Sequence, residues 1–118
     1  MKPIVYDRKE ALVQVYDDEG ILVQLEESFL GDCPALLAAI REATRNGGDG
    51  KTLADAAHKL KGSLGCFRAW RAFYAAERLE RVGCEKSFAQ TAEALESLER
   101  ELEAFRAAIF SERLALRV

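Results

Sequence analysis

Apolar residues recur three and four positions apart along most of this chain, which is the spacing of one buried face on an α-helix. Strand-like alternation is not sustained anywhere, and the two prolines stand at positions 3 and 34. The pattern therefore predicts five helices, the first of them short. We expect them over residues 8–16, over residues 18–45, from a cap at Asp49 or Thr52 to about Phe67, over residues 69–82, and over residues 86–114.

Two of these helices carry the longest apolar stripes. The stripe of the second is Leu22, Leu25, Phe29, Cys33, Leu36 and Ile40, and that of the fifth is Phe88, Ala92, Leu95, Leu98, Leu102, Phe105 and Ile109. Gly31 and Pro34 fall inside the second helix, where we expect a kink rather than a break between domains. The glycine-rich residues 46–50 predict a loop, and Gly83 predicts the C-terminal cap of the fourth helix.

Amphipathic helices joined by short connections pack against one another around a shared core. The predicted fold class is therefore all-α: an antiparallel four-helix bundle with a short additional N-terminal helix. A chain of 118 residues is long enough for one stable core, so we expect a single domain over residues 1–118.

Composition narrows the classes of partner. With 49% hydrophobic and 31% charged residues the chain reads as a folded globular protein. Its net charge of −3 gives no electrostatic reason to expect nucleic acid or an anionic membrane. No apolar run approaches the roughly 20 residues that span a bilayer, and the first residues lack the apolar stretch of a signal peptide. We expect a cytoplasmic protein.

The three cysteines are odd in number and far apart, which fits reduced thiols rather than a disulfide framework. We interpret them as small buried hydrophobes. One histidine and no pair of closely spaced cysteines give no metal site.

The single histidine, His58, stands in the run AAHKLKGSLG. A lone histidine in a helical bundle is often a core residue, but a helical-wheel projection of this segment argues against a core position for His58. At about 100° per residue, the apolar residues of this helix lie roughly 160–260° from His58. They are Leu53, Ala56, Ala57, Leu60, Leu64 and Phe67. We therefore expect an exposed imidazole.

Two glycines share the face of this histidine. Gly62 falls about 40° from His58 on one side, while Gly65 and Lys61 fall about 20° and about 60° from it on the other side. Glycine inside a helix costs about 1 kcal/mol relative to alanine, so two glycines here indicate a need for space beside the ring. A neutral imidazole nitrogen is a nucleophile, and the Lys61 ammonium would neutralise a small anionic group placed next to it.

No catalytic partner or cofactor motif accompanies this nucleophile. The chain contains no GxxxxGK[ST] phosphate loop. Its sequence also shows no pair of carboxylates suited to act as acid and base beside the histidine. We expect no enzyme activity and no cofactor. A protein that accepts a phosphoryl group but cannot take it from ATP must exchange it with another protein.

The run His58-Lys59-Leu60-Lys61-Gly62-Ser63 resembles the H-x-L-K-G-S signature of the histidine phosphotransfer (HPt) domain family of bacterial two-component phosphorelays. The resemblance covers nearly the whole chain. Residues 29–34 and 36–37 resemble the family's second helix. Its fourth helix is similar to the stretch that contains Ala69, Ala72, Ala76, Leu79 and Glu80.

The resemblance implies a bundle in which the ring nitrogen farther from the backbone takes a phosphoryl group from a receiver-domain aspartate, or returns it. By motif position, His58 is then the phospho-acceptor, Lys61 stabilises the phosphoryl group and Gly62 supplies steric clearance. Lys59 is an accessory charge. The implied partners are response-regulator receiver domains and hybrid sensor kinases, and the resemblance favours a monomer.

Two positions depart from the family's pattern. Cys66 stands where the family often has asparagine, and Arg68 stands where it often has glycine. Arginine adopts positive φ less easily than glycine. We therefore expect the turn between the third and fourth helices to differ from the family's.

Trp70 and Tyr74 lie one turn apart on the side of the fourth helix away from its apolar stripe. They are either partly buried against the end of the third helix or anchors for a partner. With Lys59 and Gly65 they form the docking surface that the sequence suggests.

Two alternatives to a phosphotransfer protein stay open. A helical interaction module would bind a receiver or kinase through the same face without being phosphorylated. The dimerisation helices of a sensor kinase fit less well, because a lysine, Lys59, follows the histidine where an acid would be expected.

Overall fold

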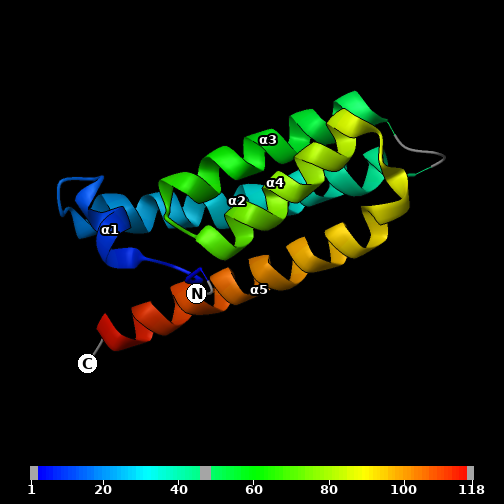
Figure 1. Ribbon diagram of the computed structural model, residues 1–118. Coiled ribbons are helices and arrows are strands. Elements are labelled where there is room, and N and C mark those ends of the chain that lie inside the picture. Colours follow the sequence, from blue (N-terminus) through cyan, green and yellow to red (C-terminus); the bar gives the residue numbers. More distant parts are fainter. Residues whose placement is uncertain (1–2, 46–48, 117–118) are drawn as a thin grey trace.

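The computed structural model describes residues 3–45 and 49–116, and this part of the chain is all-α (Figure 1). Residues 46–48 of the predicted loop over residues 46–50 lie outside the described residues. The elements are α1 (Arg8–Val13), α2 (Glu19–Ala43), α3 (Gly50–Cys66), α4 (Trp70–Glu85), the 3-10 turn η1 (Phe88–Gln90) and α5 (Thr91–Leu116).

Aspartates begin the first three helices. In each case the carboxylate accepts a hydrogen bond from the backbone N–H three residues later and so satisfies one of the helix's free donors. The three pairs, each at 3.1 Å, are Asp7 with Glu10, Asp18 with Ile21, and Asp49 with Thr52. Helix α4 has no such side chain, and the N-terminal segment supplies its acceptor: the Ile4 carbonyl accepts a hydrogen bond from the Arg71 N–H at 3.2 Å.

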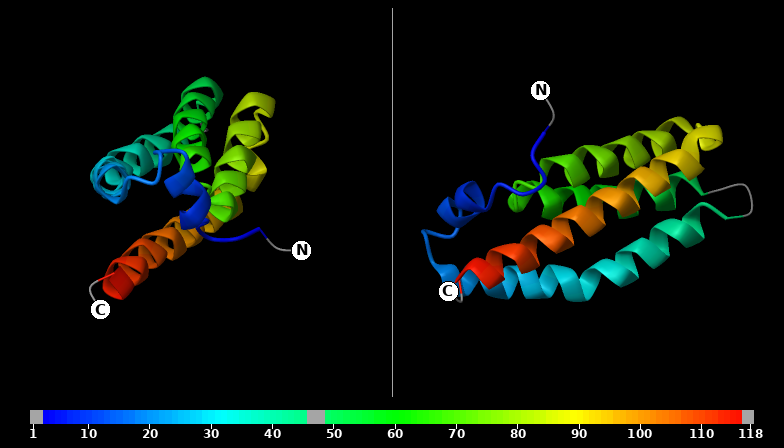
Figure 2. Two further views of the ribbon diagram at one scale, coloured as in Figure 1. Left: turned by 90° about the vertical axis from the view of Figure 1, so that its left-hand side faces the viewer. Right: turned by 90° about the horizontal axis from the view of Figure 1, so that it is seen from below.

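The four long helices form a bundle in which α3 and α4 are antiparallel neighbours (Figures 1 and 2). Helix α2 lies beside α3, and α5 lies beside α4. The short α1 and the N-terminal segment lie at the end of the bundle where α2 starts and α5 finishes. This confirms the all-α bundle with a short leading helix.

The core is built from the inner faces of all four long helices. On α3, four of the residues that the helical wheel places opposite His58 are fully buried: Leu53, Ala57, Leu60 and Leu64. Four aromatic rings meet at the α1 end with centroids 4.9–6.4 Å apart: Tyr6, Phe29, Phe67 and Phe105. Such edge-to-face contacts add to the free energy gained by burying the rings.

The predicted stripes were wrong at their margins. Leu25 of α2 is 46% exposed rather than buried. On α5, Ala94 is buried in place of Ala92, because Ala94 lies one turn before the buried Leu98 and Ala92 lies on a different face of the helix. Helix α2 continues as one helix through Gly31 and Pro34, so the chain has no break there, as predicted. The kink expected at these residues stays a prediction.

Gly83 was also assigned wrongly. The sequence predicted a helix cap there, but α4 continues to Glu85 and ends at Lys86, whose φ is 54°. Gly83 instead touches α3: a Cβ at this position would lie 2.6 Å from the Gly50 carbonyl oxygen and 2.8 Å from the Ala54 nitrogen. The backbones of α3 and α4 therefore meet at a point that only glycine permits.

Candidate functional site: an exposed histidine between two helices

His58 lies in the middle of α3 and points to solvent beside α4, with 67% of its side chain exposed. The predicted exposure is confirmed. Because the neighbouring core positions Ala57 and Leu60 are fully buried, the helix has no freedom to rotate the ring inward. The imidazole is thus presented on a rigid element.

A carboxylate on α4 binds two of the predicted site residues on α3. Glu80 Oε2 lies 2.6 Å from His58 Nδ1, and Lys61 Nζ donates a hydrogen bond to Glu80 Oε1, also at 2.6 Å. Glu80 and Lys61 are largely covered, with side chains 20% and 21% exposed. One acid therefore fixes the positions of the imidazole and the ammonium together.

This contact determines which ring nitrogen of His58 is free. An ionised carboxylate only accepts hydrogen bonds, so Nδ1 carries the hydrogen that it donates to Glu80. In the neutral ring the lone pair then resides on Nε2, the nitrogen farther from the backbone. The Glu80 contact therefore leaves Nε2 free on the exposed side of the ring.

The hydrogen-bonded pair of Glu80 and Lys61 shifts the pKa of each group in the direction that favours its charged form. The hydrogen bond from Lys61, and then the one from His58, hold the pKa of the Glu80 carboxyl below its usual value. The same bond from Lys61 to Glu80 raises the pKa of the Lys61 ammonium. Both groups are therefore charged across the neutral range.

The glycine contact between α3 and α4 explains why Glu80 reaches His58. Gly83 packs against Ala54. In this antiparallel pair, one turn along α3 leads from Ala54 to His58, and one turn back along α4 leads from Gly83 to Glu80. The close backbone approach thus sets the register that brings the two side chains together.

Sequence reasoning did not assign Glu80 to the site. The residue was noted only as part of the resemblance in the fourth helix, and it lies 22 positions from His58. A wheel of α4 places it at the edge of the buried stripe, next to Leu79. The signal needed to pair it with His58 was the contact at Gly83, which the sequence pattern suggested to be a helix cap.

The two glycines beside His58 differ. A Cβ built at Gly62 has nothing within 4 Å, so this side of the ring is open as predicted. At Gly65, however, a Cβ would lie 3.4 Å from the ring of Phe73, which is only partly buried and covers Gly65 from α4. The expected clearance at Gly65 is therefore wrong: the glycine accommodates Phe73.

Other residues of the motif have simpler positions. Lys59 is exposed, and Ser63 bonds back to the Lys59 carbonyl oxygen at 3.5 Å within the helix. Of the three free cysteines, Cys33 is partly buried while Cys66 and Cys84 are exposed, so the buried interpretation fails for these two.

The turn after α3 contains a left-handed residue that is not glycine. Arg68 has a φ of 59°, so arginine does adopt the left-handed conformation here, and a difference between this turn and the family's stays a prediction. Its guanidinium donates to the Gly65 carbonyl oxygen at 3.1 Å and lies 5.7 Å from the centre of the Trp70 ring. Both contacts favour a conformation that is strained for a residue with a Cβ.

Trp70 and Tyr74 lie outside the core, as predicted. Trp70 is partly buried and Tyr74 is 50% exposed. Their rings gather with Phe73, each about 5.2 Å from it, on the α4 side of the histidine. The partial burial of Trp70 agrees with the first alternative. A role for the pair as anchors for a partner stays a prediction.

An apolar groove of about 510 Å³ lies on the other side of α3, toward α1 and α2. Its wall on α3 is Ser63 and Cys66, and its rim on α2 includes the exposed Leu25. Gly62 lies between this groove and His58 on the surface of α3, since it falls on the same side of the ring as Cys66. The open flank of the histidine thus leads toward the groove.

Two other classes of site are absent from residues 3–45 and 49–116. These residues contain no cluster of histidine, cysteine and acidic side chains arranged to hold a metal ion. Within the same ranges, no helix is both long enough and apolar enough to cross a lipid bilayer.

The fold and this geometry define a class of protein: an all-α bundle that presents one oriented imidazole, with an ammonium beside it, for chemistry with another molecule. The chain belongs to the Hpt domain family, whose family model matches residues 24–108. Members of this family are phosphotransfer-capable histidine modules of phosphorelays and interact with receiver domains and kinases. No curated protein and no solved structure matches the chain.

Proposed function

We propose that this protein carries a phosphoryl group on His58, accepting it from the aspartyl phosphate of one receiver domain and passing it to another. The observation that supports this most strongly is the Glu80 contact. It holds Nδ1 and leaves Nε2 free on a ring that is 67% exposed. An interaction module has no need of an oriented nucleophile.

The transfer step follows from these positions. The Nε2 lone pair attacks phosphorus in line with the bond to the receiver's aspartyl oxygen. The N–P bond forms as the O–P bond breaks, and the bonding electron pair leaves with the receiver carboxylate. The hydrogen on Nδ1 stays in its bond to Glu80 and stabilises the positive charge that develops on the ring. The reverse step returns the group to a receiver.

Lys61 acts on the phosphoryl oxygens. An ammonium has three donors, and Glu80 accepts one of them at 2.6 Å. The other donors are available to oxygens of a group on Nε2. Their positive charge offsets the negative charge of the phosphoryl group in the transition state and in the phosphorylated protein.

The receiver approaches over Gly62 in this proposal. That side of the ring is open and leads to the apolar groove, while Phe73 and Glu80 occupy the α4 side. Lys59 is exposed and adds a cation to the docking surface. Docking of the receiver through Trp70 and Tyr74 stays a prediction. Gly65 contributes to this surface only by leaving room for the ring of Phe73.

The same proposal makes the protein a carrier rather than an enzyme. Its partners are receiver domains, alone or within hybrid sensor kinases, and its compartment is the cytoplasm. The phosphoryl group arrives already activated, so the chain needs no nucleotide and no metal ion of its own.

Incubation with a receiver that carries a labelled phosphoryl group on its aspartate tests the proposal. Label should appear on the wild type, disappear with His58→Gln, and appear more slowly with Lys61→Ala. His58→Gln should still bind the receiver, because docking involves many residues besides the ring. A receiver that binds the wild type but never transfers label to it would favour the non-phosphorylated interaction module.

A further inference from the structure

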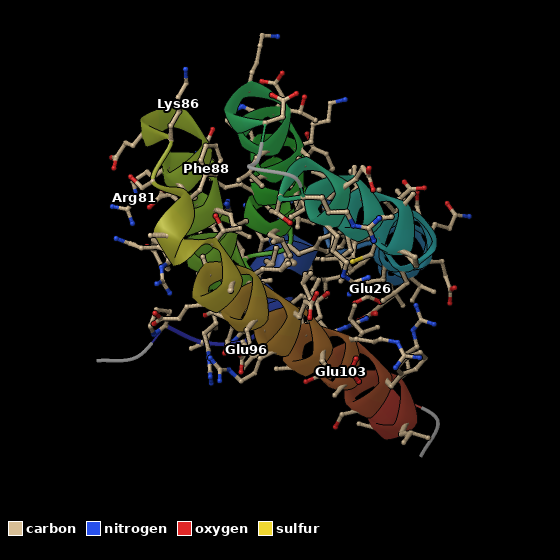
Figure 3. The ribbon with its side chains drawn as sticks, turned by 90° about the vertical axis from the view of Figure 1, so that its right-hand side faces the viewer. Glu26, Arg81, Lys86, Phe88, Glu96 and Glu103 are labelled. Atoms are coloured by element: carbon tan, nitrogen blue, oxygen red, sulfur yellow. The ribbon has the colours of Figure 1, made fainter. Side chains whose placement is uncertain are left out.

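Glu26 is a charged side chain inside the bundle, near the end where α2 starts and α5 finishes. It is fully buried and lies on the inner face of α2 between the buried apolar residues Leu22 and Phe29. Figure 3 shows Glu26 between α2 and the C-terminal half of α5. The transfer step proposed above does not involve this carboxylate, so its burial needs an explanation of its own.

The Glu26 carboxylate contacts groups from three other parts of the chain. The Tyr6 hydroxyl of the N-terminal segment donates a hydrogen bond to Glu26 Oε2 at 2.5 Å. Arg8 Nε of α1 lies 3.9 Å from the same oxygen, and Arg113 Nη2 of α5 lies 3.6 Å from Oε1. Burial and the bond to Glu26 raise the pKa of the Tyr6 hydroxyl, so the phenol keeps its proton as a donor. One carboxylate therefore connects α2 to the N-terminal segment, α1 and α5.

Both arginines of this cluster also bind a second, more exposed acid. Arg8 pairs with Glu19 at 2.5 Å, and Arg113 pairs with Glu27. Replacing Glu26 by an uncharged residue therefore removes the buried negative charge but leaves each guanidinium with an acid. The role of Glu26 can thus be tested without leaving an unpaired cation in the core.

Helix α1 depends on contacts of this kind, because it has little apolar surface to bury. It is six residues long, and a helix of that length is not stable alone in water. Of its residues Arg8–Val13, Ala11 alone is buried. Buried charge pairs often stabilise a fold less than apolar side chains would, and a role that remains for them is to fix one arrangement of the elements. The contacts of Glu26 therefore determine where α1 lies on α2.

The position of α1 shapes the apolar groove beside the histidine. Ala11, together with Gln14 and Val15 just after the helix, lines this groove of about 510 Å³. The opposite part of the lining includes Cys66 of α3. Glu26 is fully buried and is not among the lining residues, so it acts on the groove only through the elements that it holds.

We infer that Glu26 is a positioning residue for receiver docking: through Tyr6 and Arg8 it fixes α1 as a preformed wall of the groove beside His58. The inference rests on the proposed exchange with a receiver and adds a residue to its docking step. A wall that is already in place costs less ordering when a partner binds. The chemistry at His58 involves only α3 and α4, so Glu26 affects the affinity for the receiver and not the transfer rate from a saturating receiver.

Transfer kinetics with a receiver domain that binds the wild type test this inference. Glu26→Gln removes the buried charge, and Tyr6→Phe removes one hydroxyl while it keeps the aromatic ring. Glu26→Gln should raise the half-saturating receiver concentration about tenfold, and Tyr6→Phe should raise it less. Both variants should keep the wild-type rate at saturation.

Glu101→Gln is the matched control for loss of a buried acid. Glu101 is also buried and bound to an arginine, Arg71 at 2.6 Å, but it links α5 to α4 and does not contact α1. Glu101→Gln should reduce thermal stability about as much as Glu26→Gln and leave the half-saturating receiver concentration unchanged. Equal losses of affinity in the two variants would overturn the inference.

Two measurements that need no phosphoryl transfer complete the test. The dissociation constant for the unphosphorylated receiver should rise in Glu26→Gln by the same factor as the half-saturating concentration. Hydrogen exchange of the backbone amides of α1 should become faster in Glu26→Gln, with those of α3 unchanged. Unchanged affinity in both folded variants, or a lower rate at saturation, would overturn the inference. If the wild type binds the receiver but accepts no label, the phosphotransfer proposal fails, whereas weaker binding by Glu26→Gln still supports the positioning role.

Discussion

Glu80 holds His58 and Lys61 at once, with one carboxylate oxygen 2.6 Å from His58 Nδ1 and the other 2.6 Å from Lys61 Nζ. In the proposed mechanism this acid is a positioning residue: it touches neither the phosphoryl group nor the receiver. It orients the nucleophile through Nδ1 and holds the ammonium on the same side of the ring.

Replacing Glu80 should slow transfer without abolishing it. A hydrogen bond to a charged group is worth about 1.5–3 kcal/mol, so Glu80→Ala should reduce the rate roughly ten- to a hundredfold if the whole loss falls on the transition state. Glu80→Gln keeps an acceptor for Nδ1 and should lose less. Rates of label transfer from a saturating receiver measure this.

The matched control for that series is Glu77→Ala. Glu77 lies one turn earlier on α4 and acts on Lys61 through space. It should change the rate only slightly. Equal losses for Glu77→Ala and Glu80→Ala would show that net negative charge on α4, and not the contact with Nδ1, affects transfer.

The bridge between Glu80 and Lys61 predicts a pH window for stability. The pKa of Glu80 is lowered by its hydrogen bond from Lys61, so its contribution is complete above the ordinary value of 4.5 and is lost as pH falls through the lowered pKa. The pKa of Lys61 is raised, so its contribution is complete below 10.5 and is lost only above that value.

Urea unfolding of the wild type and Glu80→Gln across pH measures this window. The difference in unfolding free energy should be constant from about pH 8, above the range in which a histidine ordinarily titrates, up to 10.5, and should decrease in acid below 4.5. A difference that changes between about pH 8 and 10.5, or that does not decrease in acid, would mean that other groups control the bridge.

Gly62 and Gly31 form a natural pair for testing steric clearance. A Cβ at either position has nothing within 4 Å, and both lie inside helices. Gly62→Gln and Gly31→Gln should each raise stability by a similar amount, about 0.5–1 kcal/mol, because glycine is a poor helix former.

Only the Gly62 variant should impair transfer, since its side chain would stand where the receiver approaches the ring. Thermal unfolding and label transfer on the same samples separate the two effects. Normal transfer by a folded Gly62→Gln protein would contradict the approach over Gly62.

Gly83→Ala should have the opposite effect on stability. Its Cβ would lie 2.6 Å from a backbone oxygen of α3, so the two helices must separate. Overpacking of this kind costs about 1–3 kcal/mol. Because the same contact sets the position of Glu80, transfer should slow as well. A variant as stable as the wild type would show that the α3–α4 register does not depend on this glycine.

The outcome at Gly83 also shows what the sequence could and could not predict. The spacing of hydrophobic residues predicted the helices and placed His58 opposite Leu60 and Leu64. This works because residues three and four positions apart in the sequence share one face of a helix. The same reasoning could not separate Gly62 from Gly65. That difference depends on Phe73, which is contributed by another helix.

The hydrophobic pattern of each single helix cannot predict the contacts between helices, for a physical reason. The register of two packed helices is set by a few close approaches, here the one between Gly50 and Gly83. A glycine near a helix end looks the same in the sequence whether it caps the helix or admits a neighbouring backbone. Glu80 was missed as a result, because its pairing with His58 follows from that register.

The most direct test of the carrier assignment is the position of the phosphoryl group on the phosphorylated protein, read from nitrogen chemical shifts and phosphorus couplings of the imidazole by NMR. Phosphorylation should place the group on Nε2 of His58, with Nδ1 still protonated and bound to Glu80. A phosphoryl group on Nδ1, or on any residue other than His58, would contradict the account.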